Sequence, residues 1–260
     1  LQKEGEDCQT LNIWAPHDSR NKKKPVFIWI HGGGYFAGNA LEEYSFDGFN
    51  LAHYGDIVFV SINHRLNILG HLDLSEYSSR YHNSVNAGIS DVVMALKWIH
   101  ENIAAFGGDP ENVTLCGHSG GGGKVQCMYQ ISEAAPYFQR GIELRGALKS
   151  DLDPTPDDPR QVTKAILEEL GITKDNIHRI SEVPFKDLLA AHQKTAPLLR
   201  QKGVNTSWSP VANDYFPGFP GTVGFMTESA DKPLICGSTL GEFEEMFMHL
   251  DETEKVAMGK

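Results

Sequence analysis

The chain has 260 residues, of which 40% are hydrophobic and 22% charged, with a formal net charge of −11. This length suits one large domain with a sizeable core, and the composition is that of a folded globular protein. The acidic balance argues against a nucleic-acid surface, which needs clustered Lys and Arg, and no apolar run approaches the roughly 18 residues of a membrane span.

The four cysteines and the chain start bear on metal binding and location. The cysteines lack CxxC or Cys/His ligand spacing, so we expect no metal site. No other motif in the sequence indicates a cofactor, and none is expected. No signal-peptide pattern is visible, which favours a cytoplasmic protein, but the chain opens with Leu1 rather than Met and its location stays open. The sequence does not indicate an oligomeric state.

Four short apolar runs, rich in β-branched and aromatic residues, end at polar or glycine-rich turns. Because they lack clean alternation, they are typical of strands buried on both faces of a parallel sheet. The runs are Pro25 to Ile30, Ile57 to Asn63, Asn112 to Gly117 and Pro233 to Gly237.

Helices are predicted between these runs. One apolar stripe recurs at three- and four-residue intervals and ends at Gly107-Gly108; its members are Ile89, Val92, Val93, Leu96, Ile99, Ile103 and Phe106. A second helix has Pro159 in its first turn and Gly171 at its end, and with "PFKDLLAAH" it predicts a helical excursion at about 155–200. We therefore expect an α/β fold in a single domain over residues 1–260.

The stretch "LCGHSGGGGKV", Leu115 to Val125, allows two interpretations. A phosphate-binding loop needs a glycine where His118 stands and a hydroxyl where Val125 stands, so the Gly-Lys pair alone is insufficient. The pattern Gly-x-Ser-x-Gly is complete, with Ser119 between a strand and a helix. Glycines two positions away on either side let the nucleophile sit on a sharp turn without colliding with its neighbours.

The segment "HGGGY" follows the first buried run. Ester hydrolysis places negative charge on the carbonyl oxygen, and each backbone N–H group that points at it lowers the barrier by roughly 3 kcal/mol. We assign Gly33 and Gly34 as such donors, together with Gly120 after the serine. His31 is expected to brace the loop.

Several segments of the sequence resemble the type-B carboxylesterase family, the cholinesterase-like branch of the α/β-hydrolases. The resemblance rests on "EDCQTLNIWAP", "PVFIWIHGGGYFAG", "SINHRLNILG", "NAGISDVVMALKWIHENIAAFGGDPENVTLCGHSGG" and "PLICGSTLGEFEEMF", in family order. The ending "SGGGGKV" is more similar to bacterial members than to animal cholinesterases. The resemblance implies an α/β-hydrolase fold with a mostly parallel sheet flanked by helices.

The resemblance also implies site residues. It assigns Ser119 as nucleophile and Glu242, in "GSTLGEF", as the catalytic acid, while Asp214 falls in a non-catalytic segment. The family's histidine lies further downstream than this chain reaches, and helical His249 is a poor candidate for it. We therefore expect a partial domain, incomplete on its C-terminal side, whose catalytic histidine lies outside the chain; without that base, Ser119 would lose most of its reactivity.

The expected activity is hydrolysis of carboxylic esters through an acyl-enzyme, with a small-molecule ester as substrate. His118 replaces the glutamate of cholinesterases, so a choline ester is unsupported, and small or medium acyl esters with uncharged alcohol groups are expected. A non-catalytic cholinesterase-like binding protein is the alternative, because such proteins have a broken triad.

Overall fold

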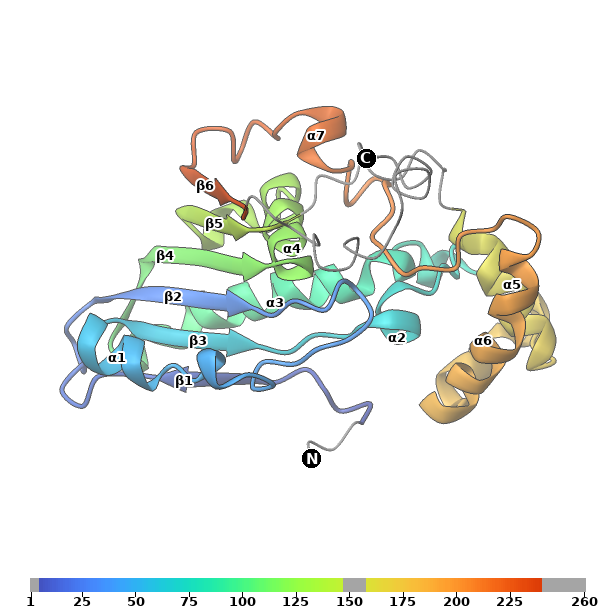
Figure 1. Ribbon diagram of the computed structural model, residues 1–260, viewed down its shortest axis with the longest axis horizontal. Coiled ribbons are helices and arrows are strands. Elements are labelled where there is room, and N and C mark those ends of the chain that lie inside the picture. The colour runs from blue at the N-terminus through green and yellow to red at the C-terminus, as the bar shows by residue number, and fades with distance from the viewer. Residues whose placement is uncertain (1–4, 147–157, 240–260) are drawn as a thin grey trace, which may run out of the picture.

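The computed structural model describes residues 5–146 and 158–239, which form a six-stranded sheet (Figure 1). The order across the sheet is β1-β3-β2-β4-β5-β6; β1 is antiparallel to β3 and the other neighbours are parallel. The strands are β1 (Leu11–Trp14), β2 (Lys24–Ile30), β3 (Val58–Ile62), β4 (Gly108–His118), β5 (Arg140–Leu144) and β6 (Leu234–Gly237).

Helices join the strands and cover the sheet. The α-helices are α1 (Phe49–Gly55), α2 (Asn67–His71), α3 (Ala87–Asn102), α4 (Gly120–Gln130), α5 (Pro159–Glu169), α6 (Phe185–Arg200) and α7 (Pro220–Val223). Short 3-10 helices are η1 (Tyr44–Phe46), η2 (Ser79–Tyr81), η3 (Ser84–Asn86), η4 (Ile103–Phe106), η5 (Ala135–Tyr137) and η7 (Lys174–Glu182).

The four predicted strands are confirmed as strands, but β6 is mostly exposed rather than buried on both faces, because it stands at the edge of the described sheet. Two further strands were not predicted. β1 is half-buried throughout, and β5 alternates between buried and more exposed positions, so neither has the long apolar run of a central strand. β4 begins at Gly108, before the predicted Asn112, because its first residue pairs with Lys24 across an irregularity in the register. The sequence did not predict this extension, because Asp109 and Pro110 are residues typical of turns.

The predicted amphipathic helix is confirmed as α3, whose last turn tightens into η4. Its stripe packs into the main core with the inner residues of β2, β3 and β4. Phe106 departs from the prediction because it is 40% exposed, at the end of η4. Gly107 follows with a φ of 84°, the left-handed conformation that ends a helix.

Within the helical excursion predicted at about 155–200, the structure has α5, η7 and α6, and α6 continues past the segment "PFKDLLAAH" to Arg200. Asp158 caps α5 by accepting a hydrogen bond from the Arg160 N–H. α5 and α6 bury a second apolar cluster that includes Ile68 of α2. In Figure 1 this helical pair lies on the side toward which the parallel strands point.

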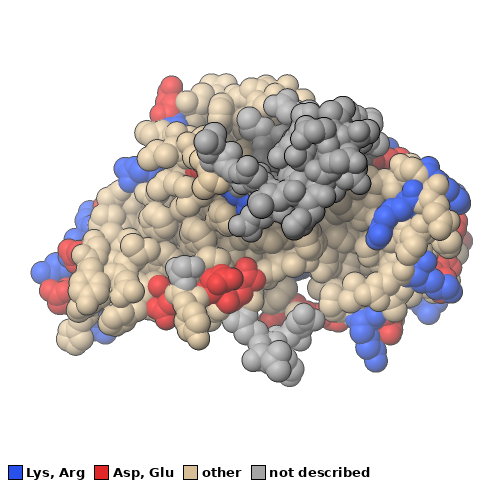
Figure 2. Space-filling view, viewed as in Figure 1, with Lys and Arg blue, Asp and Glu red and all other residues tan. Residues whose placement is uncertain are grey.

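The surface carries mixed charges. Figure 2 shows that Lys and Arg are interspersed with Asp and Glu on the α5–α6 end of this face, so neither sign forms a continuous patch there. None of the helices within residues 5–146 and 158–239 combines the length and the apolar character needed to cross a bilayer. The assignment of all 260 residues to one domain stays a prediction.

Candidate active site

Ser119 occupies the turn between β4 and α4, with φ 56° and ψ −124°. A residue with a Cβ rarely adopts this conformation, and such strain is concentrated at functional sites. Two backbone hydrogen bonds hold the turn: the Ser119 N–H donates to the Leu144 carbonyl at 2.8 Å, and the Gly123 N–H donates to the Ser119 carbonyl at 3.1 Å. The serine is half-buried and stands at the head of a helix.

The glycines around Ser119 are required by close packing, as the sequence analysis predicted. A Cβ on Gly117 would lie 2.8 Å from the backbone nitrogen of Gly122 in α4. A Cβ on Gly121 would lie 2.8 Å from the carbonyl oxygen of His31. Both distances are below any normal Cβ contact, so side chains at these positions would push the turn away from the strand and the helix.

The glycine loop after β2 lies directly against this turn. Gly33 and Gly34 have φ values of 81° and 61°, which only glycine adopts readily. The loop closes through a hydrogen bond from the Ala37 N–H to the Gly33 carbonyl at 3.1 Å. A Cβ added to Gly120 would lie 2.5 Å from the Gly34 Cα, so backbone meets backbone here.

Three backbone donors in this region have no acceptor among the residues that the structure describes. Within the described part of the chain, the N–H groups of Gly33, Gly34 and Gly120 donate to no other described residue. For Gly120 this follows from its position, because the first N–H groups of a helix have no intrahelical acceptor and carry its positive dipole end. Unpaired donors beside a strained serine suit an anionic ligand atom.

Asn67, at the start of α2, holds the outer side of the loop. Its backbone N–H donates to the Tyr35 carbonyl at 2.7 Å, and its side-chain Nδ2 donates to the Phe36 carbonyl at 3.3 Å. Asn67 itself has a φ of 43°, a conformation that asparagine tolerates better than most residues. The sequence analysis missed this contact, because only the fold brings the two loops together.

Buried histidines lie behind the loop. His31 is 1% exposed, and its Nδ1 lies 2.9 Å from the Gly32 carbonyl oxygen, which agrees with the predicted bracing role. Its ring stacks on that of His64 at 5.0 Å between centroids. Burial lowers the pKa of His31 to about 4 and the pKa of His64 well below its usual value, with the Lys124 charge adding to both effects. Both rings are therefore neutral at pH 7.

An ion pair fixes the loop after β3 to α3. Asp91, whose side chain is only 5% exposed, accepts hydrogen bonds from Nε and Nη2 of Arg65 at 2.8 and 2.7 Å. It also accepts from the Arg65 backbone N–H and from Nε2 of Gln9. This bidentate geometry serves to anchor the chain that leads to α2 and Asn67.

A cavity of about 480 Å³ opens beside the glycine loop. Phe36, 60% exposed, forms one wall, and His192, Val204 and Trp208 are among the others. The Phe36 ring reaches the loop itself, because a Cβ on Gly34 would lie 2.9 Å from its Cε1. Phe36 is therefore the residue through which the glycine loop contributes to this cavity.

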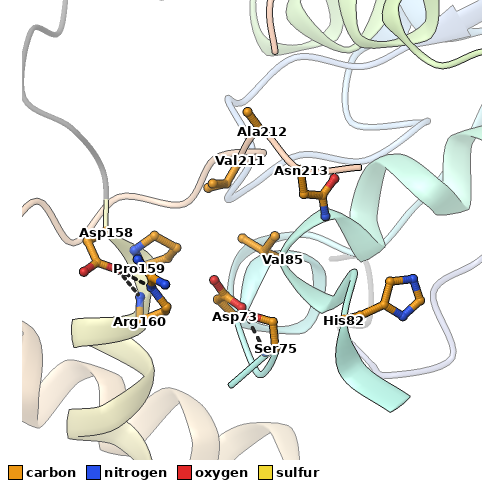
Figure 3. Close-up of a pocket in the computed structure, with 10 residues that line it drawn as sticks. All are labelled: Asp73, Ser75, His82, Val85, Asp158, Pro159, Arg160, Val211, Ala212 and Asn213. Carbon is orange, nitrogen blue, oxygen red and sulfur yellow. Dashed lines mark hydrogen bonds and ion pairs between the residues drawn. The ribbon is translucent and has the colours of Figure 1, made fainter. Parts of the chain in front are cut away.

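A second cavity, of about 220 Å³, lies between α5 and the segments around Asp73 and Asn213 (Figure 3). Figure 3 shows Asp73 joined to Ser75 and Arg160 joined to Asp158, while His82 points away from these groups. None of the lining residues comes from β4, α4 or the glycine loop, so this cavity is separate from the serine turn.

The structure thus brings four of the predicted site residues together: Ser119, Gly33, Gly34 and Gly120. Glu242 and His249 lie outside the described residues. Among residues 5–146 and 158–239, no group of three or more His, Cys, Asp or Glu side chains is arranged to hold a metal ion.

Comparison with known proteins gives one consistent family. Residues 1–258 match the model of the Carboxylesterase family. The chain is 39% identical over 191 residues to para-nitrobenzyl esterase of Bacillus subtilis (strain 168), covering 74% of this chain and 38% of that protein. It is 33% identical over 244 residues to carboxylesterase 3B of Mus musculus, covering 92% of this chain and 39% of that protein.

Solved structures agree. An esterase from anaerobic Clostridium hathewayi, described as able to hydrolyze aliphatic aromatic polyesters, superposes with a TM-score of 0.88 at 41% identity, covering 98% of this chain and 52% of that one. A PNB esterase superposes with a TM-score of 0.84 at 32% identity, covering 99% and 55%. The chain spans about half of these structures and less than half of the two curated relatives. The matched sequence, the superposed sheet and the serine turn place this chain in the carboxylesterase family, with an α/β-hydrolase fold.

Proposed function

We propose that this chain carries the nucleophile and the oxyanion hole of a carboxylic-ester hydrolase. The observation that carries the proposal is the meeting of strained Ser119 with the unpaired N–H groups of Gly33, Gly34 and Gly120. Acyl transfer needs this combination, because the nucleophile and the donors must face the same carbonyl group from two sides.

In the proposed reaction the Ser119 hydroxyl attacks the ester carbonyl while a base takes its proton. The three N–H groups stabilise the oxyanion, the alcohol leaves with a proton returned by the base, and water then releases the acid from the acyl-enzyme. The base is a histidine outside this chain, and Glu242 is the acid that orients it. Family membership supports both assignments.

The cavity beside Phe36 is the proposed site for an apolar part of the substrate. Its walls include aromatic and aliphatic side chains, and one of them is Phe36, whose ring reaches Gly34, so an apolar group bound there would extend from an ester held at the glycine loop. The name of one relative refers to para-nitrobenzyl, and a similar solved structure is described as hydrolyzing aliphatic aromatic polyesters, which agrees with an aromatic or medium-sized apolar group and an uncharged alcohol.

A fluorophosphonate probe tests the proposal on the protein at its natural length. Wild type should be labelled and should hydrolyse p-nitrophenyl esters, and Ser119→Ala should lose both while keeping its melting temperature. Phe36→Ala should remain labelled but change the order of preference among acyl chain lengths. Absence of labelling in folded wild type would contradict the assignment of Ser119.

A further inference from the structure

Lys124 is a charged residue buried within α4. Its exposure is 0%, and the neighbouring helix residues Gly121 to Gln130 are buried as well. Burying an ammonium group costs several kcal/mol unless other groups compensate for its lost hydration. In the sequence, Lys124 matches the lysine of the phosphate-loop pattern, although two other positions of that pattern do not match. In the structure the side chain is buried, so it is not available to a phosphate.

The ammonium group of Lys124 contacts the glycine loop. Nζ donates to the Gly34 carbonyl at 2.8 Å and lies 3.4 Å from the His31 carbonyl oxygen. It also lies 5.4 Å from the centroid of the Tyr35 ring, a favourable cation–π distance. Within the described residues Lys124 forms no ion pair with a carboxylate, so the loop carbonyls and the Tyr35 ring replace its hydration.

The contacts of Lys124 act on the glycine-rich part of the loop. His31 and Gly34 lie on either side of Gly32 and Gly33, so Nζ holds both ends of the glycine run. Glycines have the largest backbone freedom, and an oxyanion hole works only when its donors are oriented before the charge develops. Gly120 lies one turn earlier on the same helix, so α4 contacts Gly34 at two points.

Apart from the Glu42 carboxylate, the groups that face Lys124 are neutral at pH 7. They come from the loop, the end of β2, the segment after β3, α2 and α4, and comprise Tyr35, Glu42, His31, His64, His71 and Cys127. Burial lowers the pKa of the histidines and raises those of Tyr35 and Cys127, so these groups are neutral at pH 7. Burial also lowers the pKa of Lys124 to about 7, so it exchanges its proton near neutrality.

We propose that Lys124 is a positioning residue that fixes the Gly33–Gly34 loop against α4 and so keeps the oxyanion-hole donors aligned. The part of this inference that concerns catalysis rests on the proposed function, whereas the part that concerns loop order does not. The residue touches neither substrate nor oxyanion, and it acts through the Gly34 carbonyl.

The test compares two variants with a matched control. Lys124→Met keeps the length of the side chain without its donors, and Lys124→Gln restores one amide donor. Lys232→Met is the control: Lys232 Nζ donates to the Phe138 carbonyl at 2.8 Å and lies 5.0 Å from the Phe138 ring, the same pair of contacts at the amino ends of β5 and β6. β4, β5 and β6 are parallel, and Ser119 follows the carboxyl end of β4. The control residue Lys232 therefore lies at the opposite ends of the strands from Ser119.

Three measurements are made on the protein at its natural length: kcat and KM for a p-nitrophenyl ester, the affinity for an alkyl trifluoromethyl ketone, and hydrogen exchange of residues 31–38. The ketone reports on the oxyanion hole because its serine adduct carries an oxyanion. Lys124→Met should lower kcat and ketone affinity by about 10²-fold with KM within threefold, and Lys124→Gln should recover part of both. Exchange in 31–38 should rise while 24–30 stays protected, and Lys232→Met should change none of these values.

Kinetic values within threefold of wild type for both Lys124 variants, or unchanged exchange in 31–38, would overturn the inference. If Lys124→Met does not fold, the kinetics, ketone affinity and exchange of Lys124→Gln compared with wild type decide. If wild type does not turn over any ester but exchange still rises in the variants, the positioning role stands and the proposed function fails.

Discussion

Gly120 and Gly34 pack backbone against backbone, with a Cβ on Gly120 reaching within 2.6 Å of the Gly34 nitrogen. Gly120→Ala must therefore displace the loop or the start of α4, and either movement separates two of the proposed oxyanion donors. We expect kcat/KM to fall by about 10²-fold or more, since removal of a single donor has that effect. Steady-state kinetics on p-nitrophenyl esters measures it.

Gly55→Ala is the matched control for this substitution. Gly55 ends α1, and a Cβ there would meet only Cγ1 of Ile57 at 3.8 Å, an ordinary contact. Alanine should leave activity unchanged and stabilise the helix slightly. Full activity in Gly120→Ala would show that the loop and the helix do not need this contact.

The backbone strain at Ser119 predicts that two small substitutions differ in their effect on stability. Ser119→Gly removes the Cβ that makes φ 56°, ψ −124° unfavourable, and should raise the free energy of unfolding by about 1 kcal/mol. Ser119→Ala keeps the Cβ and should leave stability near the wild-type value, although both variants lose the nucleophile. Urea denaturation of the three proteins measures the difference, and equal stability of the Ser119→Gly and Ser119→Ala variants would show that the turn is not strained.

The Arg65–Asp91 pair predicts a large loss of stability away from the serine. Asp91→Ala leaves the guanidinium group and the Arg65 N–H without their acceptor, so we expect a loss of about 3 kcal/mol. Glu169→Ala, which removes the exposed ion pair with Lys194, should cost under about 1 kcal/mol. Thermal and urea unfolding compare the two. Similar losses from both would mean that burial of Asp91 adds nothing to the pair.

The sequence predicted those parts of the site that depend on local chain geometry. Ser119 and its flanking glycines form one strand-turn-helix unit, so a five-residue pattern sufficed to locate it. The glycine loop follows a buried strand in the same way. The serine turn and the glycine loop each follow the carboxyl end of a strand, and the two strands, β4 and β2, are neighbours in the sheet. Because these strands are parallel, their carboxyl ends lie side by side and bring the two loops together.

The contacts that sequence analysis missed join segments far apart in the chain. Lys124 reaches Gly34 across 90 positions, and Asn67 reaches the Tyr35 carbonyl from another strand connection. One signal was present for Lys124, since it is the single charged residue of a glycine-rich helix whose other polar positions are Gln126 and Gln130. No comparable signal marked Asn67, because asparagine in a loop is ordinary. Strands β1 and β5 were missed because half-burial leaves no continuous apolar run.

The buried histidines predict a loss of stability in mild acid. Burial lowers the pKa of both His31 and His71 to about 4, whereas an unfolded histidine titrates near 6.5. Between these values the unfolded state binds more protons than the folded state, so these two histidines lower the free energy of unfolding as pH drops from about 6.5 to about 4, and their contribution does not grow further below that range. Each histidine contributes a loss of about 3 kcal/mol over the whole window.

His71→Gln isolates this effect from that of the carboxylates, which titrate in an overlapping range. Glutamine does not titrate and can still donate to the Val85 carbonyl, which lies 2.8 Å from Nδ1 of His71. The slope of unfolding free energy against pH should therefore fall by up to about 1.4 kcal/mol per pH unit between pH 4.5 and 6. His17→Gln, at an exposed histidine, is the control for the substitution itself. An unchanged slope in His71→Gln would mean that the folded protein protonates His71 as readily as the unfolded chain does.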